Sequence, residues 1–394
     1  MSGAVIAGAG RVTQMSGPPA VEPGDAAAID VVAVGSAIVD ILVHATPADL
    51  VRLEVDAGTM TLVDLVASER LRASVAPVAQ VSGGSVANTV VGVAALGGTA
   101  GFIGRTADDE LGSLFCSDLA RSGVQVGRTT HTPGAGGAAG AGSGSDAATG
   151  RCVVLVTPDG ERTMVTHLGV ASMLTTHDLD EDMLAAARVV YLEGYLWDVP
   201  SATAALHRAI EVAHAGDGLV AVSVSDRLCV ERHRRELLDL LRDDVDVLFA
   251  NEEEAIALMG VPTVEAAVAA IEETGVLSAV TLGPAGSVVV MPGSSVTVPA
   301  APVATVVDTT GAGDLYAAGF LYGLTNGANP VECARLGGAC AAEIISHMGA
   351  RPQADLRGML VPNANANANA NANANADADA DADANANANA NARS

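Results

Sequence analysis

The sequence contains no lysine: all 20 basic residues in this chain of 394 residues are arginine. The absence excludes chemistry that needs an ε-amine, which includes Walker A phosphate loops, protein kinases and Schiff-base enzymes. The formal net charge is −26 at pH 7, and the densest basic cluster is Arg232, Arg234 and Arg235. Nucleic acid and anionic membranes are therefore not expected as partners.

Cysteine and aromatic residues are also scarce. The five cysteines show no Cys-x-x-Cys spacing, which argues against a disulfide framework and a zinc site and favours a reducing, cytoplasmic location. No signal-peptide pattern and no run of ~18 apolar residues is present, so no membrane span is expected. Aromatics make up 2% of residues and hydrophobic residues 49%. Small aliphatic side chains must fill the core, which favours buried parallel strands between Ala-rich helices.

Three segments have low complexity. Residues 1–28 indicate a flexible leader, residues 133–148 a Gly/Ala-rich loop insertion, and residues 363–394, which alternate Asn-Ala and Asp-Ala, a disordered tail. The folded domain is therefore predicted to span residues 29–362. Gly8-Ala9-Gly10 resembles the start of a dinucleotide fingerprint, but no strand precedes it, so NAD binding is not indicated.

Inside that domain, apolar runs alternate with helical patterns. This predicts a doubly wound α/β fold, with a mostly parallel sheet and helices on both faces. Two segments, about residues 41–62 and 152–168, break the alternation and predict a small accessory sheet, with a turn at Pro158-Asp159-Gly160. The expected strands are Asp30–Val34, Ala100–Ile103, Val153–Val156, Val189–Leu192, Leu219–Val224, Val247–Ala250, Ala279–Leu282 and Ser287–Val290. The expected helices are Val86–Leu96, Leu111–Ser122, Ser201–Ala215, Glu252–Met259, Val264–Thr274, Asp314–Leu324 and Pro330–His347.

The strongest chemical signal is Asp308-Thr309-Thr310-Gly311-Ala312-Gly313-Asp314, which follows a predicted strand, Ala304–Val307, and opens a helix. The N–H groups of Gly311, Ala312 and Gly313 at a helix N-terminus form an anion cradle suited to phosphate. Asp314 in the first turn can then accept the proton of an attacking hydroxyl. The alternative is an ordinary acidic residue at a helix start.

A second signal is Ser82-Gly83-Gly84-Ser85-Val86-Ala87-Asn88. Gly83 and Gly84 permit a backbone bend against a sugar, and Asn88 offers both a donor and an acceptor to hydroxyl groups. Asp40, expected at the end of the first strand, can accept two hydroxyl hydrogen bonds. The alternatives are a plain turn before a helix and a loop aspartate.

A third signal is Asn251-Glu252-Glu253-Glu254 after the strand Val247–Ala250. Asn251 and Glu254 suit water-mediated magnesium, but the same spacing is a helix capping box worth about 1 kcal/mol, and both roles can coexist. Thr281, Gly283 and Gly286 form a further strand end and turn.

Taken in this order, the motifs resemble the signatures of the ribokinase-like (PfkB) carbohydrate kinases. The stretches Tyr191–Asp198 and Asp314–Phe320 are similar to the bacterial adenosine kinases of that family. The resemblance implies a ribokinase-like fold with a small β-lid. It also implies an ATP- and Mg²⁺-dependent kinase that phosphorylates the primary hydroxyl of a nucleoside, converting adenosine to AMP.

The resemblance also assigns roles to residues. Asp314 is implied as the catalytic base, with Gly311, Ala312 and Gly313 at the phosphate. The implied acceptor-binding residues are Asp40, Gly83, Gly84 and Asn88. The implied nucleotide-binding residues are Asn251, Glu254, Thr281, Gly283, Gly286, Thr309 and Ala339, of which Asn251 and Glu254 also organise magnesium. In some members a monovalent cation such as K⁺ binds at the positions of Asp308 and Thr310.

Two alternatives stay open at this point. The acceptor can be a free sugar such as ribose or fructose, or the chain can be a non-catalytic nucleoside-binding regulator on a kinase scaffold. The aromatic residues available to stack on a purine are Phe102, Tyr195 and Trp197. The expected partners are a small-molecule acceptor and ATP, and the expected assembly is a monomer or a homodimer.

Overall fold

The computed structural model describes residues 28–127, 130–131, 148–158 and 160–360. The chain divides into two compact units, Met1–Ala354 and Asp355–Ser394. In the second unit, the described residues include a short 3-10 helix, Leu356–Leu360. The predicted leader, loop insertion and tail lie outside the described residues, apart from residues 28 and 148.

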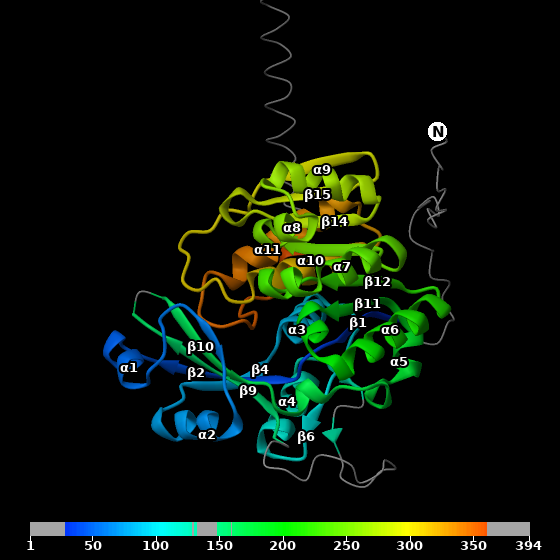
Figure 1. Cartoon of the computed structure of the whole chain (residues 1–394). Coiled ribbons are helices and arrows are strands. Elements are labelled where there is room, and N and C mark those ends of the chain that lie inside the picture. The colour runs from blue at the N-terminus through cyan, green and yellow to red at the C-terminus, as the bar shows by residue number, and fades with distance from the viewer. Residues whose placement is uncertain (1–27, 128–129, 132–147, 159, 361–394) are drawn as a thin grey trace, which may run out of the picture. The chain divides into compact units, whose positions relative to one another are not determined.

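The first unit contains a nine-stranded sheet in the order β16-β15-β14-β13-β12-β11-β1-β5-β7 (Figure 1). All neighbours from β7 to β14 are parallel, whereas β15 and β16 are antiparallel to their neighbours. This confirms the predicted α/β fold. The strands are β1 (Ile29–Val34), β5 (Ala100–Ile103), β7 (Val124–Val126), β11 (Ala187–Glu193), β12 (Leu219–Ser223), β13 (Val247–Asn251), β14 (Leu277–Thr281), β15 (Ser287–Met291) and β16 (Ser294–Val298).

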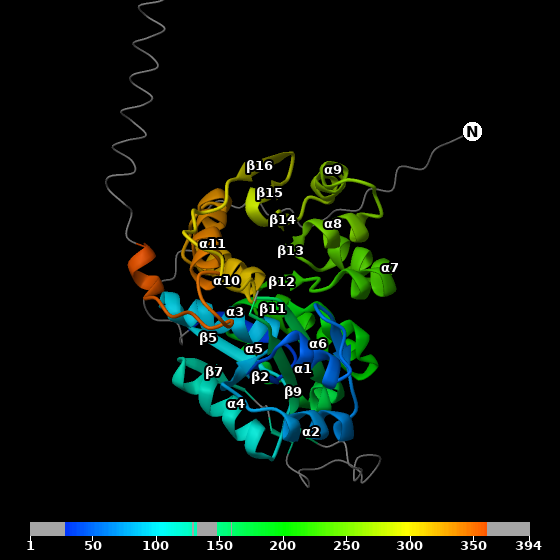
Figure 2. The same ribbon diagram turned by 90° about the vertical axis from the view of Figure 1, so that its left-hand side faces the viewer.

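Helices cover both faces of this sheet (Figure 2). One face carries α3 (Ser85–Leu96), α10 (Ala312–Thr325) and α11 (Pro330–Ile344). The other face carries α5 (Glu181–Ala185), α6 (Pro200–Ala215), α7 (Arg227–Asp243), α8 (Glu252–Met259) and α9 (Val264–Thr274). Sequence analysis missed α7, because its charged face dominates the pattern, although Cys229, Val230 and Leu237 are buried.

A second, five-stranded sheet, called the small sheet here, has the order β3-β10-β9-β2-β4. It contains the two segments expected to break the alternation and adds β4, which was not expected. Its strands are β2 (Ile38–His44), β3 (Met60–Leu62), β4 (Ala79–Gly83), β9 (Gly150–Val156) and β10 (Arg162–His167). The remaining elements are α1 (Pro47–Arg52), α2 (Leu65–Ser74), α4 (Glu110–Arg121) and a two-stranded sheet of β6 (Thr106–Ala107) and β8 (Thr130–His131).

Two local predictions are wrong. Asp40 does not end the first strand but lies within β2, because the chain leaves the large sheet at Gly35–Ala37 and pairs with β4 and β9. The run Ala304–Val307 is not a strand; Val306 and Val307 are 58% and 45% exposed. Asp159, in the middle of the predicted turn between β9 and β10, lies outside the described residues.

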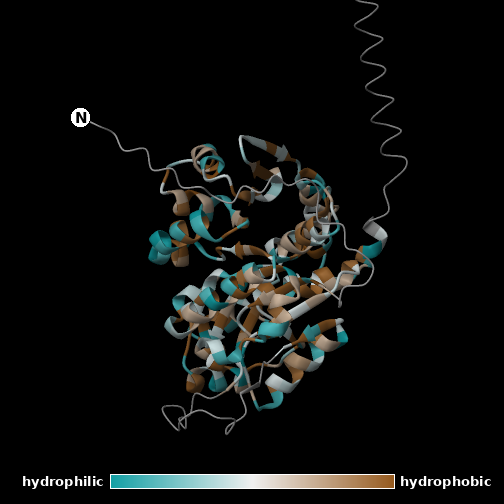
Figure 3. Ribbon diagram, turned by 90° about the vertical axis from the view of Figure 1, so that its right-hand side faces the viewer, coloured by the Kyte–Doolittle hydropathy of each residue, from teal (hydrophilic) through white to brown (hydrophobic). Residues whose placement is uncertain are grey.

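The core follows from the composition. Aliphatic side chains of the central strands, such as Val31, Val32 and Val34, are fully buried, and Figure 3 shows these strands as mostly hydrophobic. The few aromatics pack together: the rings of Tyr191 and Phe320 both contact Phe249 edge-on. Among the described residues, no single helix is long and apolar enough to cross a membrane, and one bent pair, α8 with α9, passes by length and composition.

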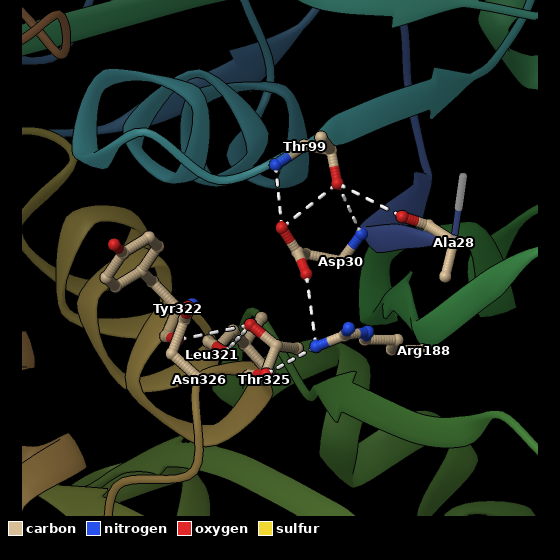
Figure 4. A network of polar contacts seen from close by, with 8 residues as sticks. All are labelled: Ala28, Asp30, Thr99, Arg188, Leu321, Tyr322, Thr325 and Asn326. Atoms are coloured by element: carbon tan, nitrogen blue, oxygen red, sulfur yellow. Dashed lines mark hydrogen bonds and ion pairs between the residues drawn. The ribbon is translucent and has the colours of Figure 1, made fainter. Parts of the chain in front are cut away.

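A polar network ties the far end of α10 to the large sheet (Figure 4). Arg188 at the start of β11 donates to the carbonyl of Thr325 at 2.7 Å and pairs with Asp30 at 3.6 Å. Asp30 in turn accepts the N–H of Thr99 at 2.8 Å. A cation at a helix C-terminus is favourable because the last carbonyls lack partners in the helix. The network therefore anchors the end of α10 that lies opposite Asp314.

Replacing Arg188 with methionine should lower the free energy of unfolding by about 1–2 kcal/mol, because the Thr325 carbonyl loses a charged donor. Urea unfolding followed by circular dichroism measures the change. The control is Arg242→Met, which removes an exposed pair with Asp239 and should leave the midpoint unchanged. Equal stability of Arg188→Met and the unsubstituted protein would show that the anchor contributes nothing.

Candidate active site

The N-terminus of α10 brings a turn and a carboxylate together. Gly311 is the N-cap residue with φ 71°, and a Cβ there would lie 2.8 Å from the Cβ of Ala350. Only glycine meets both constraints without strain. The next residues open the helix, where N–H groups lack intrahelical partners and the helix dipole is positive. This end of α10 is suited to an anion.

Asp314 lies in the first turn of α10, and both of its carboxylate oxygens accept hydrogen bonds from α3. Ser85 Oγ donates to Oδ1 at 2.7 Å, and Asn88 Nδ2 donates to Oδ2 at 2.8 Å. Burial raises the pKa of Asp314, while these two hydrogen bonds and the charges of Arg351 and Arg162 oppose the rise. A carboxylate with a raised pKa that is held in a fixed orientation is suited to accept a proton.

Asn88 was predicted to bind hydroxyl groups of the acceptor, and in the structure its amide nitrogen holds Asp314. Its Oδ1 atom is buried and has no hydrogen-bond partner among the described residues. Buried polar atoms without partners are rare and call for an explanation. A donor from a bound molecule would satisfy this atom.

Asp40 lies beside the same site. A side chain at Gly83 would overlap its carboxylate, and one at Gly84, where φ is 92°, would approach the carbonyl of Ser36. Burial raises the pKa of Asp40 to about 6, opposed by Arg351 and Arg162, and the charge of Asp314 adds to the rise. The structure thus brings together Asp40, Gly83, Gly84, Asn88 and Asp314, which are far apart in sequence.

Two arginines at this site were missed by sequence analysis. Arg162, at the start of β10, pairs with Asp308 at 3.7 Å, and Arg351 donates to Ala87 O and to the backbone and side-chain oxygens of Ser82. The charges of both guanidinium groups lower the pKa values of Asp40 and Asp314. The Nε atom of each arginine is buried without a hydrogen-bond partner among the described residues. No local motif marks them, since only the fold brings them to Asp314.

Glu193, at the end of β11, was also missed as a site residue. Its side chain is buried and accepts the N–H of Ser36 at 2.6 Å. Burial raises its pKa to about 7, while hydrogen bonds from Ser36 and Ser85 oppose the rise and the charge of Asp314 adds to it. A carboxylate at the C-terminal end of a parallel strand lies where such sheets bind ligands.

Asn251 and Glu254 form the capping box of α8. Asn251 Nδ2 donates to Glu254 Oε1 at 2.7 Å, and Glu254 N donates to Asn251 Oδ1 at 2.9 Å. Burial raises the pKa of Glu254 to about 7, and Asp226 and Glu253 add to the rise. Such a carboxylate gains from a nearby divalent cation, and oxygen donors suit magnesium. No cluster of three His, Cys, Asp or Glu ligands exists in the described part of the chain.

The remaining predicted nucleotide residues lie at different points of the large sheet. Thr281 ends β14 and is the register partner of Asn251 on β13. Gly283 is the first residue of a single 3-10 turn, Gly283–Ala285, and Gly286 follows it, packed too closely against Val298 O for a side chain. Thr309 is exposed before α10, and Ala339 lies half-buried on α11. No contact given by the structure joins these residues to Asp314.

Asp308 and Thr310 do come together. Thr310 N donates to Asp308 Oδ1 at 2.9 Å, and Gly349 N donates to Oδ2 at 2.8 Å. Burial of Asp308 opposes ionisation, but hydrogen bonds from Thr310 and Gly349 and the charge of Arg162 outweigh it and lower its pKa. The carboxylate expected to hold a monovalent cation is thus already paired with an arginine.

The aromatic candidates for purine stacking are mostly in the core. Phe102 is fully buried against Phe115, and Trp197 is buried in the main hydrophobic cluster, so neither can stack on a ligand. Tyr195 is 38% exposed. Two of the three predicted candidates are therefore wrong, because the scarce aromatics fill the interior.

Comparisons with known proteins identify the family and similar structures. The family model "pfkB family carbohydrate kinase" matches residues 55–356. Adenosine kinase from Sinorhizobium meliloti is 40% identical with a TM-score of 0.76, over 84% of this chain and 98% of that chain. A probable sugar kinase from Rhizobium etli CFN 42 is 37% identical with a TM-score of 0.77, over 85% and 98%. A fructokinase from Klebsiella pneumoniae is 30% identical over 264 residues, 65% of this chain and 81% of the relative.

The matched region contains both glycine-rich motifs and most of the site described above. The similar proteins are named as kinases of different small molecules, adenosine and fructose, so the names do not identify the acceptor of this chain. The kinases of this family use ATP, normally with Mg²⁺. The chain therefore belongs to the pfkB family of carbohydrate kinases and is a phosphotransferase that acts on a hydroxyl group of a sugar or nucleoside.

Proposed function

We propose that the protein transfers the γ-phosphoryl group of ATP to the primary hydroxyl of a nucleoside, adenosine before others, with Asp314 as the general base. The observation that carries the proposal is the position of Asp314. Its carboxylate lies in the first turn of α10 and is held by Ser85 and Asn88. The charges of two partly buried arginines, Arg162 and Arg351, lower its pKa, and the Nε atom of each has no hydrogen-bond partner in the described structure.

In this mechanism, the hydroxyl groups of the acceptor bind to Asp40 and to Asn88 Oδ1, an atom without a hydrogen-bond partner in the described structure. The attacking hydroxyl gives its proton to Asp314 as its oxygen bonds to the γ-phosphorus, and the bond from phosphorus to the bridging oxygen breaks with its electron pair leaving on ADP. The amides of Gly311, Ala312 and Gly313 and the guanidinium of Arg162 stabilise the charge on the transferring group.

Asn251 and Glu254 would hold magnesium through water, beside the triphosphate. When bound, the ion neutralises charge on the phosphate oxygens. The proposed nucleotide site extends over Thr281, Gly283, Gly286, Thr309 and Ala339. A monovalent cation at Asp308 and Thr310 stays a prediction, and such an ion would compete with Arg162 for the Asp308 carboxylate.

A nucleoside is favoured over a free sugar by the small sheet. The register places Leu42, Val154 and Met164 side by side on the face that also carries Asp40, because side chains two residues apart share a face. Val154 is buried, and the partly buried Leu42 and Met164 form the accessible part of this apolar face. An apolar surface next to a hydroxyl-binding carboxylate suits a molecule with both a base and a ribose. The identity to an adenosine kinase supports the same choice, whereas the fructokinase relatives support the sugar.

A regulatory, non-catalytic role is disfavoured because the carboxylate and the helix N-terminus lie together. A cytoplasmic location is part of the proposal, supported by four cysteines that are buried and form no disulfide in the described structure: Cys152, Cys229, Cys333 and Cys340. A monomer or a homodimer remains the expected assembly.

Asp314→Asn should lower kcat by about 10²- to 10⁴-fold with little change in ATP affinity, since the amide cannot accept the proton but preserves the shape. Coupled-assay kinetics and calorimetric titration of a nonhydrolysable ATP analogue measure the two quantities. Asp239→Asn, at an exposed position on α7, is the control. Near-normal turnover by Asp314→Asn would refute the role of base.

The pH dependence of kcat/KM for the acceptor should show an acidic limb with a midpoint near or above pH 6. Activity needs ionised Asp40 and Asp314, and the pKa of each is raised by burial, to about 6 for Asp40. Activity is therefore lost as pH falls through these values, well above the pKa of an ordinary aspartate. A limb with its midpoint near pH 4 would contradict the buried site.

Comparison of kcat/KM for adenosine, ribose and fructose under the same conditions identifies the acceptor. The proposal expects adenosine to exceed both sugars by at least about tenfold, because burial of the base against an apolar surface adds more than about 1.4 kcal/mol. If kcat/KM is higher for fructose or ribose, the acceptor is a free sugar and not a nucleoside, while the proposed mechanism is unchanged. ATP consumption that no acceptor stimulates would favour the regulatory alternative.

A further inference from the structure

Ser85 stands where the small sheet joins the large one. Strand β4 ends at Gly83, Gly84 caps the next helix, and Ser85 is the first residue of α3. From this junction the Ser85 hydroxyl donates to Asp314 Oδ1 at 2.7 Å. One residue therefore connects a strand of the small sheet directly with the proposed base, 229 positions away in the sequence.

The backbone of Ser85 contacts a second carboxylate, Glu193 at the end of β11. Glu193 accepts the N–H of Ser36 at 2.6 Å, and the backbone of Ser85 opposes the rise in the pKa of the Glu193 carboxyl. Ser36 lies between β1 and β2, which is another point where the chain passes from the large sheet to the small one. Two crossings of the chain thus share one buried carboxylate that belongs to the large sheet.

We propose that Ser85 is a positioning residue that couples the placement of the small sheet to the orientation of the Asp314 carboxylate; the inference rests on the proposed role of Asp314. An ionised carboxylate has about four lone-pair sites. Ser85 and Asn88 occupy one on each oxygen, which fixes the plane of the group and leaves the other sites for the acceptor. Ser85 therefore orients the base without blocking it.

The strand register explains how acceptor binding would reach Ser85. Asp40 on β2 pairs with Val81 on β4, and Ile38 pairs with Gly83 at the end of that strand. An acceptor bound by Asp40 thus acts on the two strands whose ends carry Ser36 and Ser85. Because Ser36 bonds to Glu193 and the Ser85 hydroxyl bonds to Asp314, a shift of β2 and β4 would alter the hydrogen bond between Ser85 and Asp314.

Ser85→Ala should lower kcat by about 10- to 100-fold, because loss of orientation at a reacting group has effects of this size. KM for ATP should stay within twofold. The acidic limb of the kcat profile should move to higher pH, since the variant lacks a hydrogen bond that favours the ionised base. The charged groups that face Asp314 remain in place: Arg162, Arg351, Asp40 and Glu193.

Matched variants separate positioning from packing. Ser85→Thr keeps the hydroxyl and should restore most of kcat and the original acidic limb. Ser117→Ala removes an exposed hydroxyl that donates to Leu114 O on the same helix, far from Asp314 in the sequence. This variant should behave like the unsubstituted protein. Glu193→Gln should change kcat less in the Ser85→Ala background than alone, because a coupled pair is not additive.

If Ser85→Ala leaves both kcat and the acidic limb unchanged, the inference about Ser85 is overturned. If Asp314→Asn is inactive in the same assays, the proposed mechanism still stands. Folded Ser85→Thr that is as slow as Ser85→Ala would also overturn it, because the hydroxyl would then not matter. Normal turnover by Asp314→Asn would instead remove the proposed function itself. Ser85→Cys, which keeps the side-chain size with a weaker donor, carries the test if Ser85→Ala does not fold.

Discussion

The site depends on one interaction, the pair of hydrogen bonds from the first turn of α3 to the carboxylate in the first turn of α10. Ser85 and Asn88 donate to the two oxygens of Asp314, so the beginnings of both helices are fixed relative to each other. Each helix starts at a glycine with positive φ, Gly84 and Gly311, where a side chain would strain or clash. The far end of α10 is anchored by Arg188. The proposed base, Asp314, thus lies on a helix whose two ends are both anchored by hydrogen bonds.

The same site contains three carboxylates and two arginines, and their charges act on one another. Asp40, Glu193 and Asp314 are three carboxylates, the first and last partly buried and Glu193 fully buried, whose pKa values are raised by loss of solvent, and Asp314 raises those of the other two. Arg162 and Arg351 compensate in part, and each retains a buried N–H without a partner in the described structure. In an acidic chain without lysine, these two arginines supply positive charge beside the base. Within the described structure, Nε of each arginine and Oδ1 of Asn88 lack hydrogen-bond partners, as the proposed ligand with both phosphate and hydroxyl groups requires.

Local patterns predicted what local residues determine. The fold class follows from alternating strands and helices, and the positions of Gly311 and Asp314 at a helix start follow from a contiguous motif. Asp40 was placed on the wrong strand because Gly35–Ala37, where the chain changes sheets, lies between two apolar runs that look alike. Ala304–Val307 was mistaken for a strand because a run of four residues, three of them apolar, is too short to show a period. Arg162, Arg351 and Glu193 reach the site only through tertiary structure, so no spacing could reveal them.

The most direct measurement is a crystal structure with acceptor and a nonhydrolysable ATP analogue bound. The account predicts the acceptor hydroxyl within about 2.6–3.2 Å of an Asp314 oxygen, with the terminal phosphate facing the amides of Gly311, Ala312 and Gly313. It also predicts a donor from the acceptor on Asn88 Oδ1. A terminal phosphate bound away from these amides, or an acceptor with no hydroxyl near Asp314, would contradict the account.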